Sequence, residues 1–195
     1  MRRPRHAPLL RSQPSLLPAV FFDRDGTLME DADYPRHPAQ VAVYPDAAPA
    51  LARLRAAGFR VVVVTNQSGL GRGYFTEADY QAVHAEFLRQ LGPGLLDATY
   101  HCPDAPDTPS AHRKPAPGMV LDAARDLSLD LAASYVVGDK AADVELAARA
   151  GLRGGVLVLT GKGGAERARC HPDFIAANLA AAADWILEAC SRSGA

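Results

Sequence analysis

Two aspartates, Asp23 and Asp25, stand one residue apart at the end of an apolar run that begins at Pro18. The run predicts a buried strand, and residues i and i+2 of a strand lie on the same side, so both carboxylates should project together. At the carboxyl end of a parallel strand they would enter the crevice where open α/β sheets bind ligands. Like charges this close need a cation, and Mg²⁺ prefers oxygen ligands. The spacing indicates metal-assisted phosphoryl chemistry, although an ordinary Asp-Gly turn remains an alternative for this segment alone.

Three further polar segments follow predicted strands or precede a predicted helix. Residues 65–69, Thr-Asn-Gln-Ser-Gly, offer a hydroxyl and backbone N–H groups that could hold a phosphate, or they form an ordinary turn. Lys114 precedes Pro115 in a rigid loop, or is a solvated surface lysine. Asp139 ends another apolar run, and Asp143 follows it, either as part of the same site or as a residue favoured in the first turn of a helix. Together these segments would bring a hydroxyl, an ammonium and more carboxylates to one edge of a sheet.

Strands and helices are expected to alternate along the chain, each recognised from its apolar spacing and its flanking Gly, Pro or capping residues. The expected strands are 18–22, 60–65, 98–102, 134–138 and 156–159, and the expected helices are 47–57, 76–91, 117–127, 141–150 and a terminal helix that starts near 176. In the terminal helix, Trp185 and Ile186 are expected to pack inward. This alternation predicts an α/β fold with a doubly wound parallel sheet.

The composition favours one domain that acts on a small molecule. The chain has 195 residues, of which 48% are hydrophobic, and a formal net charge of −1, so no basic field marks it as a nucleic-acid or membrane binder. We expect a basic tail over residues 1–17, without the apolar segment of a signal peptide, and a single domain over 18–195. The three cysteines, Cys102, Cys170 and Cys190, form no disulfide framework. These features predict a cytoplasmic protein, which we expect to be a monomer.

The ordered motifs, taken together, resemble the haloacid dehalogenase (HAD) superfamily over residues 18–162, whose fold is a Rossmann-like α/β sheet. The second acid, Asp25, is typical of the phosphatases in that superfamily. The resemblance implies that Asp23 is the nucleophile that becomes an aspartyl phosphate and that Asp25 is the general acid and base. It also implies that Thr65 and Lys114 bind the phosphoryl oxygens.

The same resemblance implies a Mg²⁺ site. Its ligands would be the Asp23 carboxylate, the backbone carbonyl of Asp25 and the carboxylate of Asp139. The residues that would support the phosphate and metal groups are Thr27, Lys140 and Asp143. The spacing between motifs leaves no room for an inserted cap domain, so the cap should be minimal and substrate recognition should come from the loops 30–45, 69–75 and 102–112.

Longer strings, among them FFDRDGTL, RKPAPGM and ASYVVGDKAAD, resemble the D-glycero-D-manno-heptose 1,7-bisphosphate 7-phosphatases. The related histidinol-phosphate phosphatases typically have Asp-Gly where this chain has Ser68-Gly69, and the following Arg72-Gly73 favours the heptose branch. The expected substrate-binding residues are Asn66, Arg72 and Arg113. For Arg72, a surface ion-pair role is an equal alternative.

One loop departs from that subgroup, many members of which hold a structural zinc through Cys-x-His and Cys-x-Cys pairs. The corresponding residues here are Cys102, Asp104, Ser110 and His112. Structural zinc strongly prefers a complete Cys and His set, so we expect no zinc. A P-loop-like stretch at 160–164 lacks the leading glycine and the Ser or Thr of an ATP site.

The resulting hypothesis is a Mg²⁺-dependent phosphatase of sugar metabolism that removes the C7 phosphate of a heptose bisphosphate. Histidinol phosphate, or another small phosphomonoester, is the alternative substrate. A non-catalytic regulator that binds phosphate is a third interpretation, against which the complete set of polar motifs argues.

Overall fold

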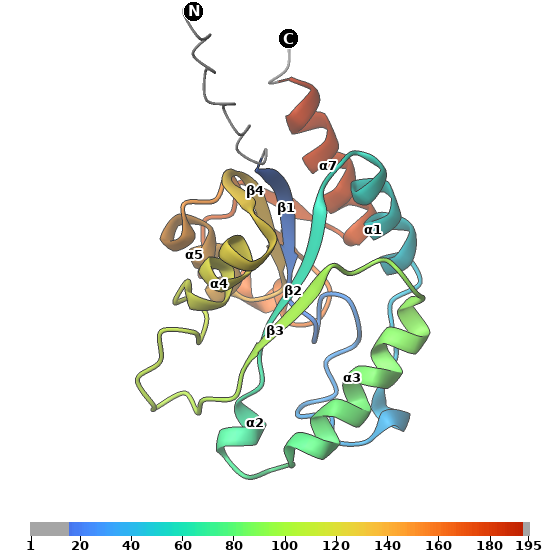
Figure 1. Ribbon diagram of the computed structural model, residues 1–195, viewed down its shortest axis with the longest axis vertical. Helices are drawn as coiled ribbons and strands as arrows, with labels where there is room; N and C mark the ends of the chain where they lie inside the picture. The colour runs from blue at the N-terminus through green and yellow to red at the C-terminus, as the bar shows by residue number, and fades with distance from the viewer. Residues whose placement is uncertain (1–15, 193–195) are drawn as a thin grey trace, which may run out of the picture.

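Six parallel strands form one sheet in the computed structural model, which describes residues 16–192 of the chain (Figure 1). The strands are β1 Leu17–Phe22, β2 Arg60–Asn66, β3 Ala98–Cys102, β4 Leu129–Gly138, β5 Gly154–Val158 and β6 Phe174–Ala176. Their order is β3-β2-β1-β4-β5-β6, so the direction of winding reverses at β1. In open α/β sheets a crevice forms at such a reversal, outside the carboxyl ends of the strands. The order thus places the end of β1, where Asp23 follows, beside the crevice.

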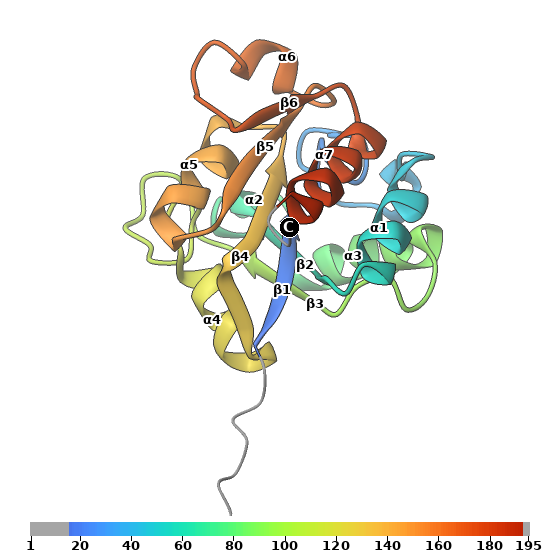
Figure 2. The same cartoon turned by 90° about the horizontal axis from the view of Figure 1, so that it is seen from above.

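Helices cover both faces of the sheet (Figure 2). They are α1 Ala47–Ala56, α2 Ser68–Gly71, α3 Glu77–Leu91, α4 Gly118–Leu127, α5 Ala141–Ala150, α6 Gly163–Glu166 and α7 Leu179–Ser191, with a 3₁₀ turn η1 at Pro38–Gln40. Alternate residues of β1 belong to two separate cores: Val20 and Phe22 pack in the core that includes α1, α3 and α7, whereas Ala19 and Phe21 pack in the core that includes α4 and α5. This arrangement confirms the doubly wound α/β fold.

Most of the predicted element boundaries agree with the structure. At the start of α3, the Thr76 side chain accepts a hydrogen bond from the Asp79 N–H, and the Asp79 side chain accepts one from the Thr76 N–H. This reciprocal capping box satisfies N–H groups that the first turn of a helix leaves free. Gly58 follows α1 with a φ of 93°, a conformation that favours glycine. Local sequence signals of this kind therefore fix helix ends well.

Several predicted boundaries are wrong, among them that of β5, which spans Gly154–Val158 and not 156–159. β4 begins at Leu129 rather than at residue 134, because its first residues pair with Leu17 and Pro18 ahead of a register shift in β1. The terminal helix begins at Leu179 and not near 176, since Ala176 belongs to β6 and pairs with Val158. Pro117 caps α4 from outside and is not its first residue.

No separate domain is inserted into the sheet within residues 16–192, as the motif spacing predicted. Of the predicted basic tail, residues 1–15 lie outside the described residues, and Leu17 already belongs to β1. The division into tail and domain stays a prediction. None of the described helices combines the length and the apolar character that a bilayer-crossing segment requires.

Candidate active site

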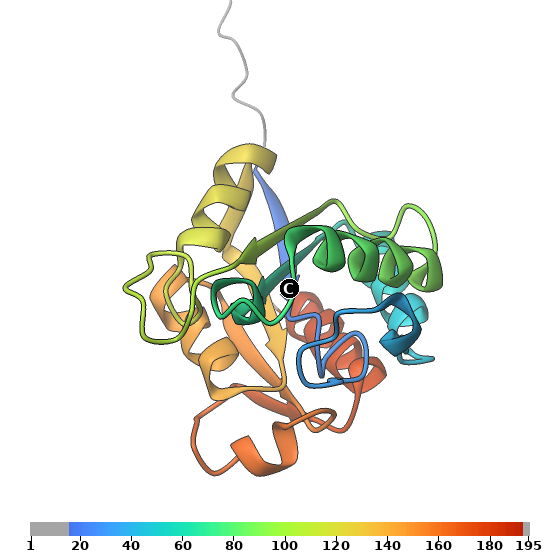
Figure 3. The same cartoon turned by 90° about the horizontal axis from the view of Figure 1, so that it is seen from below.

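A pocket of about 210 Å³ opens at the carboxyl ends of the central strands. Figure 3 views this edge of the sheet, where the loop after β1, the helix α2 and the loop before α4 come together. The pocket is lined by Asp23, Asp25, Asp31, Asp33, Tyr34, Pro35, Thr65, Asn66, Gln67, Ser68, Arg113, Lys114, Lys140, Ala142, Asp143 and Lys162. Residues from all four sequence motifs therefore meet in one cavity.

Asp23 follows β1 and is held between two lysines. Its carboxylate Oδ1 accepts a hydrogen bond from the Arg24 backbone N–H at 2.8 Å and lies 3.0 Å from Lys114 Nζ, while Oδ2 lies 3.5 Å from Lys140 Nζ. Burial by itself raises the pKa of Asp23, but the charges of Lys114 and Lys140 outweigh it and lower the pKa to about 2. At neutral pH Asp23 is therefore a carboxylate, the form that can attack phosphorus.

Lys114 is buried against two carboxylates. Its Nζ lies 3.0 Å from Asp23 Oδ1 and 2.7 Å from Asp143 Oδ1, and it donates a hydrogen bond to the Val64 carbonyl at 2.7 Å. Burial alone lowers the pKa of Lys114, yet Asp143 and Asp23 reverse the effect and raise it. The ammonium thus stays charged inside the protein.

The side chain of Asn66 holds the backbone of Lys114. Its Oδ1 accepts a hydrogen bond from the Lys114 N–H at 3.0 Å, and its Nδ2 donates one to the Lys114 carbonyl at 3.1 Å. Asn66 also lines the pocket, so its predicted contact with substrate stays open. These two hydrogen bonds fix the backbone of Lys114 in the loop before α4.

Three buried carboxylates, those of Asp23, Asp139 and Asp143, converge to form a candidate metal centre. Oxygen atoms of Asp23, Asp139 and Asp143 lie within 4.8 Å of one another. Burial, and then the charge of Asp23, raise the pKa of Asp139 to about 6, as expected for a carboxyl group buried beside other carboxylates. Oδ1 of Asp139 accepts no hydrogen bond among the described residues, although it lies 3.4 Å from the ammonium of Lys140. A carboxylate oxygen that accepts no hydrogen bond, in a buried acidic cluster, is suited to a hard divalent cation.

The ammonium of Lys140 lies among three oxygens that could also surround a metal cation. Its Nζ lies 3.5 Å from Asp23 Oδ2, 3.3 Å from the backbone carbonyl of Asp25 and 3.4 Å from Asp139 Oδ1. These are the three oxygens that the sequence resemblance assigned to Mg²⁺. The donors present therefore fit magnesium, and Asp143, which pairs with Lys114, is placed to support them.

Asp25, Thr65 and Gln67 form one hydrogen-bonded group. Nε2 of Gln67 donates to Asp25 Oδ2 at 2.7 Å and to Thr65 Oγ1 at 2.9 Å. Thr27, predicted as a supporting residue, is buried, does not line the pocket, and has a hydroxyl without a hydrogen-bond partner among the described residues. It supports the turn after β1 through its backbone, whose N–H donates to the Arg24 carbonyl at 3.3 Å.

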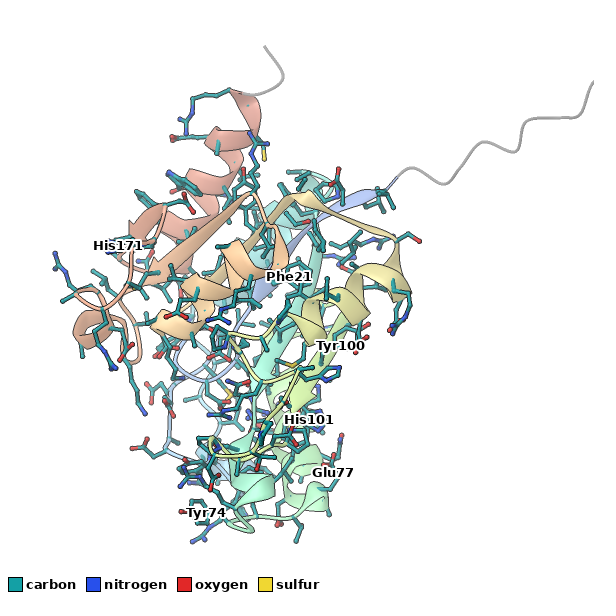
Figure 4. The ribbon with its side chains drawn as sticks, turned by 90° about the vertical axis from the view of Figure 1, so that its left-hand side faces the viewer. Phe21, Tyr74, Glu77, Tyr100, His101 and His171 are labelled. Carbon is teal, nitrogen blue, oxygen red and sulfur yellow. The ribbon has the colours of Figure 1, made fainter. Side chains whose placement is uncertain are left out.

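The two arginines predicted to bind substrate differ in position. Arg113 lines the pocket, and its Nη1 donates to the Asp104 carbonyl at 3.2 Å. Arg72 is exposed and does not line the pocket; its Nη1 lies 3.4 Å from the hydroxyl of Tyr74, which Figure 4 places at the outer end of the molecule. The structure therefore brings Arg113 to the site but not Arg72.

Sequence reasoning missed several residues at the site. Lys162 lines the pocket, and its backbone N–H donates to Asp139 Oδ2 at 2.9 Å. Just before it, Thr160 Oγ1 donates to the Gly26 carbonyl at 2.7 Å, so the segment that resembled a P-loop holds the active-site turn instead. Gln67 and Arg24 were also missed. A signal for Arg24 was present, since an arginine that stands between two site residues directly after a buried strand is expected to be buried and needs a partner.

Of the four positions that correspond to zinc ligands, Cys102, Asp104 and Ser110 lie together, whereas the His112 ring is paired elsewhere. Cys102 Sγ lies 3.5 Å from both Asp104 Oδ2 and Ser110 Oγ, whereas His112 Nε2 lies 2.8 Å from Asp122 Oδ2 of α4. Ser110 Oγ also accepts hydrogen bonds from the backbone N–H groups of His112 and Arg113. Protein hydrogen bonds thus organise this loop, and the absence of zinc stays a prediction.

Gly26 provides a test of the metal centre. Its φ is 88°, and a Cβ at this position would collide with the carboxylate of Asp139. We expect Gly26→Ala to displace Asp139 and to raise the Mg²⁺ concentration for half-maximal activity by roughly tenfold or more, in line with the effect of disturbing the groups that orient a metal ligand. The measurement is a Mg²⁺ titration of phosphate release.

Gly58→Ala is the matched control, because Gly58 has a φ of 93° but a Cβ added there would meet no atom within 4 Å. It should cost stability through the same backbone strain and leave the Mg²⁺ requirement unchanged. An unchanged Mg²⁺ requirement in Gly26→Ala would contradict the placement of Asp139 in the metal centre.

Known proteins share both the sequence and the fold. A family model described as HAD-hydrolase-like (Hydrolase_like) matches residues 111–182. A D-glycero-beta-D-manno-heptose-1,7-bisphosphate 7-phosphatase of Mesorhizobium japonicum is 46% identical over 156 residues, covering 74% of this chain and 71% of that protein. A D-glycero-D-manno-heptose-1,7-bisphosphate 7-phosphatase of Thermosynechococcus vestitus is 39% identical over 187 residues, covering 87% of this chain and 95% of that protein.

Among solved structures, the D,D-heptose 1,7-bisphosphate phosphatase from B. bronchiseptica, complexed with magnesium and phosphate, matches with a TM-score of 0.81. It is 38% identical, and the match covers 89% of this chain and 99% of that chain. The enzyme from Burkholderia thailandensis matches with a TM-score of 0.65 at 32% identity, covering 87% of this chain and 98% of that chain. The chain is therefore a HAD-superfamily phosphatase and belongs to the D-glycero-D-manno-heptose-1,7-bisphosphate 7-phosphatase family.

Proposed function

We propose that this protein removes the C7 phosphate of D-glycero-D-manno-heptose 1,7-bisphosphate through a phosphoryl group carried on Asp23. The observation that carries the proposal is the pairing of ionised Asp23 with the buried ammonium of Lys114 at 3.0 Å, in a pocket that also holds Asp25. Relatives at 46% and 39% identity bear that substrate in their names. The proposal names both a substrate and the residues that act on it.

In the first step, an oxygen of the Asp23 carboxylate forms a bond to phosphorus while the bond from phosphorus to the C7 oxygen of the sugar breaks. Asp25 gives its proton to that departing oxygen, so the sugar leaves as a neutral alcohol. Lys114 and Thr65 bind the phosphoryl oxygens as charge redistributes over them. The products of this step are the dephosphorylated sugar and an aspartyl phosphate.

In the second step, water attacks the phosphorus and the bond to Asp23 breaks. Asp25, now a carboxylate, accepts a proton from that water, which restores the starting state of the enzyme and yields inorganic phosphate. One residue thus acts first as acid and then as base. Its place beside Gln67 and Thr65 puts it at the same edge of the pocket as the phosphate-binding groups.

Asp23, the carbonyl of Asp25 and Asp139 would hold Mg²⁺, with Asp143 supporting them through Lys114. When bound, Mg²⁺ supplies positive charge to the transferring phosphoryl group and offsets the repulsion between that group and Asp23. The lysines on either side of Asp23 act in the same direction. The acidic residues are therefore compatible with an anionic substrate.

Arg113 and Lys162 are proposed to contact the second phosphate or the sugar hydroxyls. Both line the pocket, and the Lys162 side chain is 52% exposed and lies 3.2 Å from Asp33 Oδ1 and 3.4 Å from Asp31 Oδ2. Guanidinium and ammonium groups are the usual protein partners of phosphate. The loop 30–45 supplies Asp31, Asp33 and Tyr34 to the pocket lining, which supports a role for this loop in the proposed recognition of the substrate.

The substrate is tested by phosphate release in the presence of Mg²⁺ from heptose 1,7-bisphosphate, fructose 1,6-bisphosphate and histidinol phosphate, each measured at several concentrations. We expect the heptose to have the highest kcat/KM. Product analysis should show loss of the C7 phosphate with the C1 phosphate retained. A preference for histidinol phosphate, or similar low values for all three, would contradict the proposed substrate.

Metal removal gives a separate prediction. Dialysis against a chelator should abolish phosphate release, and Mg²⁺ alone should restore it, because the acidic centre needs a divalent cation whereas the loop 102–112 is held by hydrogen bonds. The measurement is activity of the chelated protein after addition of Mg²⁺, Zn²⁺ or both. A requirement for Zn²⁺ in addition to Mg²⁺ would contradict the predicted absence of zinc.

A further inference from the structure

Arg24, between the two active-site aspartates, is a fully buried charged side chain. Its exposed fraction is 0%, and its guanidinium holds both oxygens of Asp25. Nε lies 3.2 Å from Asp25 Oδ2, and Nη2 lies 3.1 Å from Oδ1 and 3.0 Å from Oδ2. A planar guanidinium that contacts both oxygens fixes the orientation of a carboxylate, which a single hydrogen bond cannot do.

Aromatic residues of α3 and β3 hold Arg24 in turn. Its guanidinium carbon lies 5.3 Å from the centre of the Tyr80 ring, which stacks on His84 at 5.8 Å and packs against His101 at 4.3 Å. Figure 4 labels His101 and Glu77 near each other in the lower part of the view, and their side chains lie 3.7 Å apart. Burial, followed by the charge of Arg24, lowers the pKa of His84 to about 4, so His84 is neutral at pH 7.

Asp25 is the one carboxylate that forms an ion pair with Arg24 among the described residues. Arg24 can donate these hydrogen bonds to Asp25 whether the carboxyl group is ionised or protonated, and removing them would leave buried donors without a partner, which is strongly unfavourable. The pair therefore keeps Asp25 in one place. Since Arg24 packs on Tyr80, that place is set by the interior of the protein and not by the substrate.

The contacts also distinguish the two oxygens of Asp25. Oδ2 accepts hydrogen bonds from Nε and Nη2 of Arg24 and from Nε2 of Gln67, whereas Oδ1 accepts one from Nη2 of Arg24. A carboxylate oxygen offers about two lone-pair directions, so Oδ2 is fully used and Oδ1 keeps one open.

We propose that Arg24 is a positioning residue that, with Gln67, fixes the Asp25 carboxylate so that Oδ1 carries the proton to the departing sugar oxygen and later takes one from water. The inference rests on the proposed function, because it assigns a task within the acid and base steps. It goes beyond that function by giving Arg24 and Gln67 roles that depend on the chemistry of the leaving group.

Arg24→Lys tests the proposal, since it keeps a buried cation but replaces the planar fork with a single ammonium. The rate of phosphoryl transfer in a single turnover of heptose 1,7-bisphosphate should fall roughly 30- to 100-fold, part of the 10²–10⁴-fold that a positioned general acid contributes. The leaving group of p-nitrophenyl phosphate departs without protonation, so the rate of phosphoryl transfer from this substrate should stay within about threefold of wild type. Asp25→Asn should give the same pattern.

Arg55→Lys is the matched control, because it makes the same substitution at another Arg-Asp pair. Arg55 Nη1 lies 2.5 Å from Asp97 Oδ2, and neither residue lines the pocket. The rates of phosphoryl transfer from heptose 1,7-bisphosphate and from p-nitrophenyl phosphate should both equal those of wild type. Equal slowing of both substrates by Arg24→Lys would show a general disturbance of the site and overturn the proposal, as would no slowing of either. If wild type left the heptose bisphosphate unchanged, the proposed substrate would be wrong, and an alkyl phosphate that it does hydrolyse would replace it in the same comparison.

Gln67→Met provides a second variant that leaves the buried charge pair intact, should Arg24→Lys fail to fold. It removes one donor from Asp25 Oδ2. Phosphoryl transfer from heptose 1,7-bisphosphate should again be slowed and transfer from p-nitrophenyl phosphate spared. The slowing should be smaller, at about 5- to 10-fold, as for the loss of one neutral hydrogen bond. Equal effects on the two substrates, or none, would overturn the proposal in this variant too.

Discussion

Asp23→Asn is expected to lower kcat by at least about 10⁴-fold, the scale on which removal of a nucleophile acts in other hydrolases. The substitution keeps the shape of the side chain and an oxygen that can accept the hydrogen bond from the Arg24 N–H. It removes the negative charge that Lys114 and Lys140 maintain. An amide oxygen is a poor nucleophile, so aspartyl phosphate does not form. The measurement is phosphate release under saturating substrate and Mg²⁺.

The control for this variant is Asp33→Asn, the same change at a side chain that lines the pocket rim and is 80% exposed. Its kcat should stay within about threefold of wild type, as expected when an interaction affects binding rather than the chemical step. Retention of about a tenth or more of wild-type kcat by Asp23→Asn would exclude Asp23 as nucleophile.

Lys114→Met is expected to lower kcat by about 10²–10³-fold, because it removes a preorganised charge from the phosphoryl oxygens. It should also lower the Tm. Asp23 and Asp143 are both buried, and each loses the ammonium at 3.0 and 2.7 Å that compensates its charge. Steady-state kinetics and thermal unfolding measured without Mg²⁺ report the two effects separately.

A double variant separates charge balance from catalysis at Lys114. Adding Asp143→Asn to Lys114→Met removes one of the uncompensated carboxylates and should recover part of the lost Tm without restoring activity. Arg125→Met, at a 70% exposed side chain of α4, should change neither kcat nor Tm appreciably. Wild-type kcat in Lys114→Met would contradict its proposed contact with the phosphoryl group.

The fold was largely predictable because its strands and helix ends have strong local signals. The β-branched run of β2 and the capping box of α3 specify their elements without help from the rest of the chain. The start of β4 was not predictable, since residues 129–133 become a strand only by pairing with Leu17 and Pro18. Ala176 has a residue type typical of helices, yet it is extended because it pairs with Val158 at the edge of the sheet.

The site was predictable where a residue follows a strand directly, as Asp23 and Asp139 do, because parallel strands end at a common edge. The positions of Lys162 and Arg72 depend on how loops fold back, which spacing does not determine. Lys162 reaches the metal centre through the start of α6, whereas Arg72 turns toward Tyr74. The partner of Arg24 also could not be inferred from motifs, since it depends on the interior packing of Tyr80.

The most direct test of the account is to trap the phosphoryl group on Asp23. Asp25→Asn should transfer phosphoryl from p-nitrophenyl phosphate at a nearly normal rate but hydrolyse the intermediate slowly, because the base is missing. Acid quenching followed by mass spectrometry of the peptide that contains residues 23–25 should then show about one phosphoryl group per chain at Asp23. The double variant Asp23→Asn with Asp25→Asn should show none. Absence of the label in Asp25→Asn during phenol release, or its presence on another residue, would contradict the central claim.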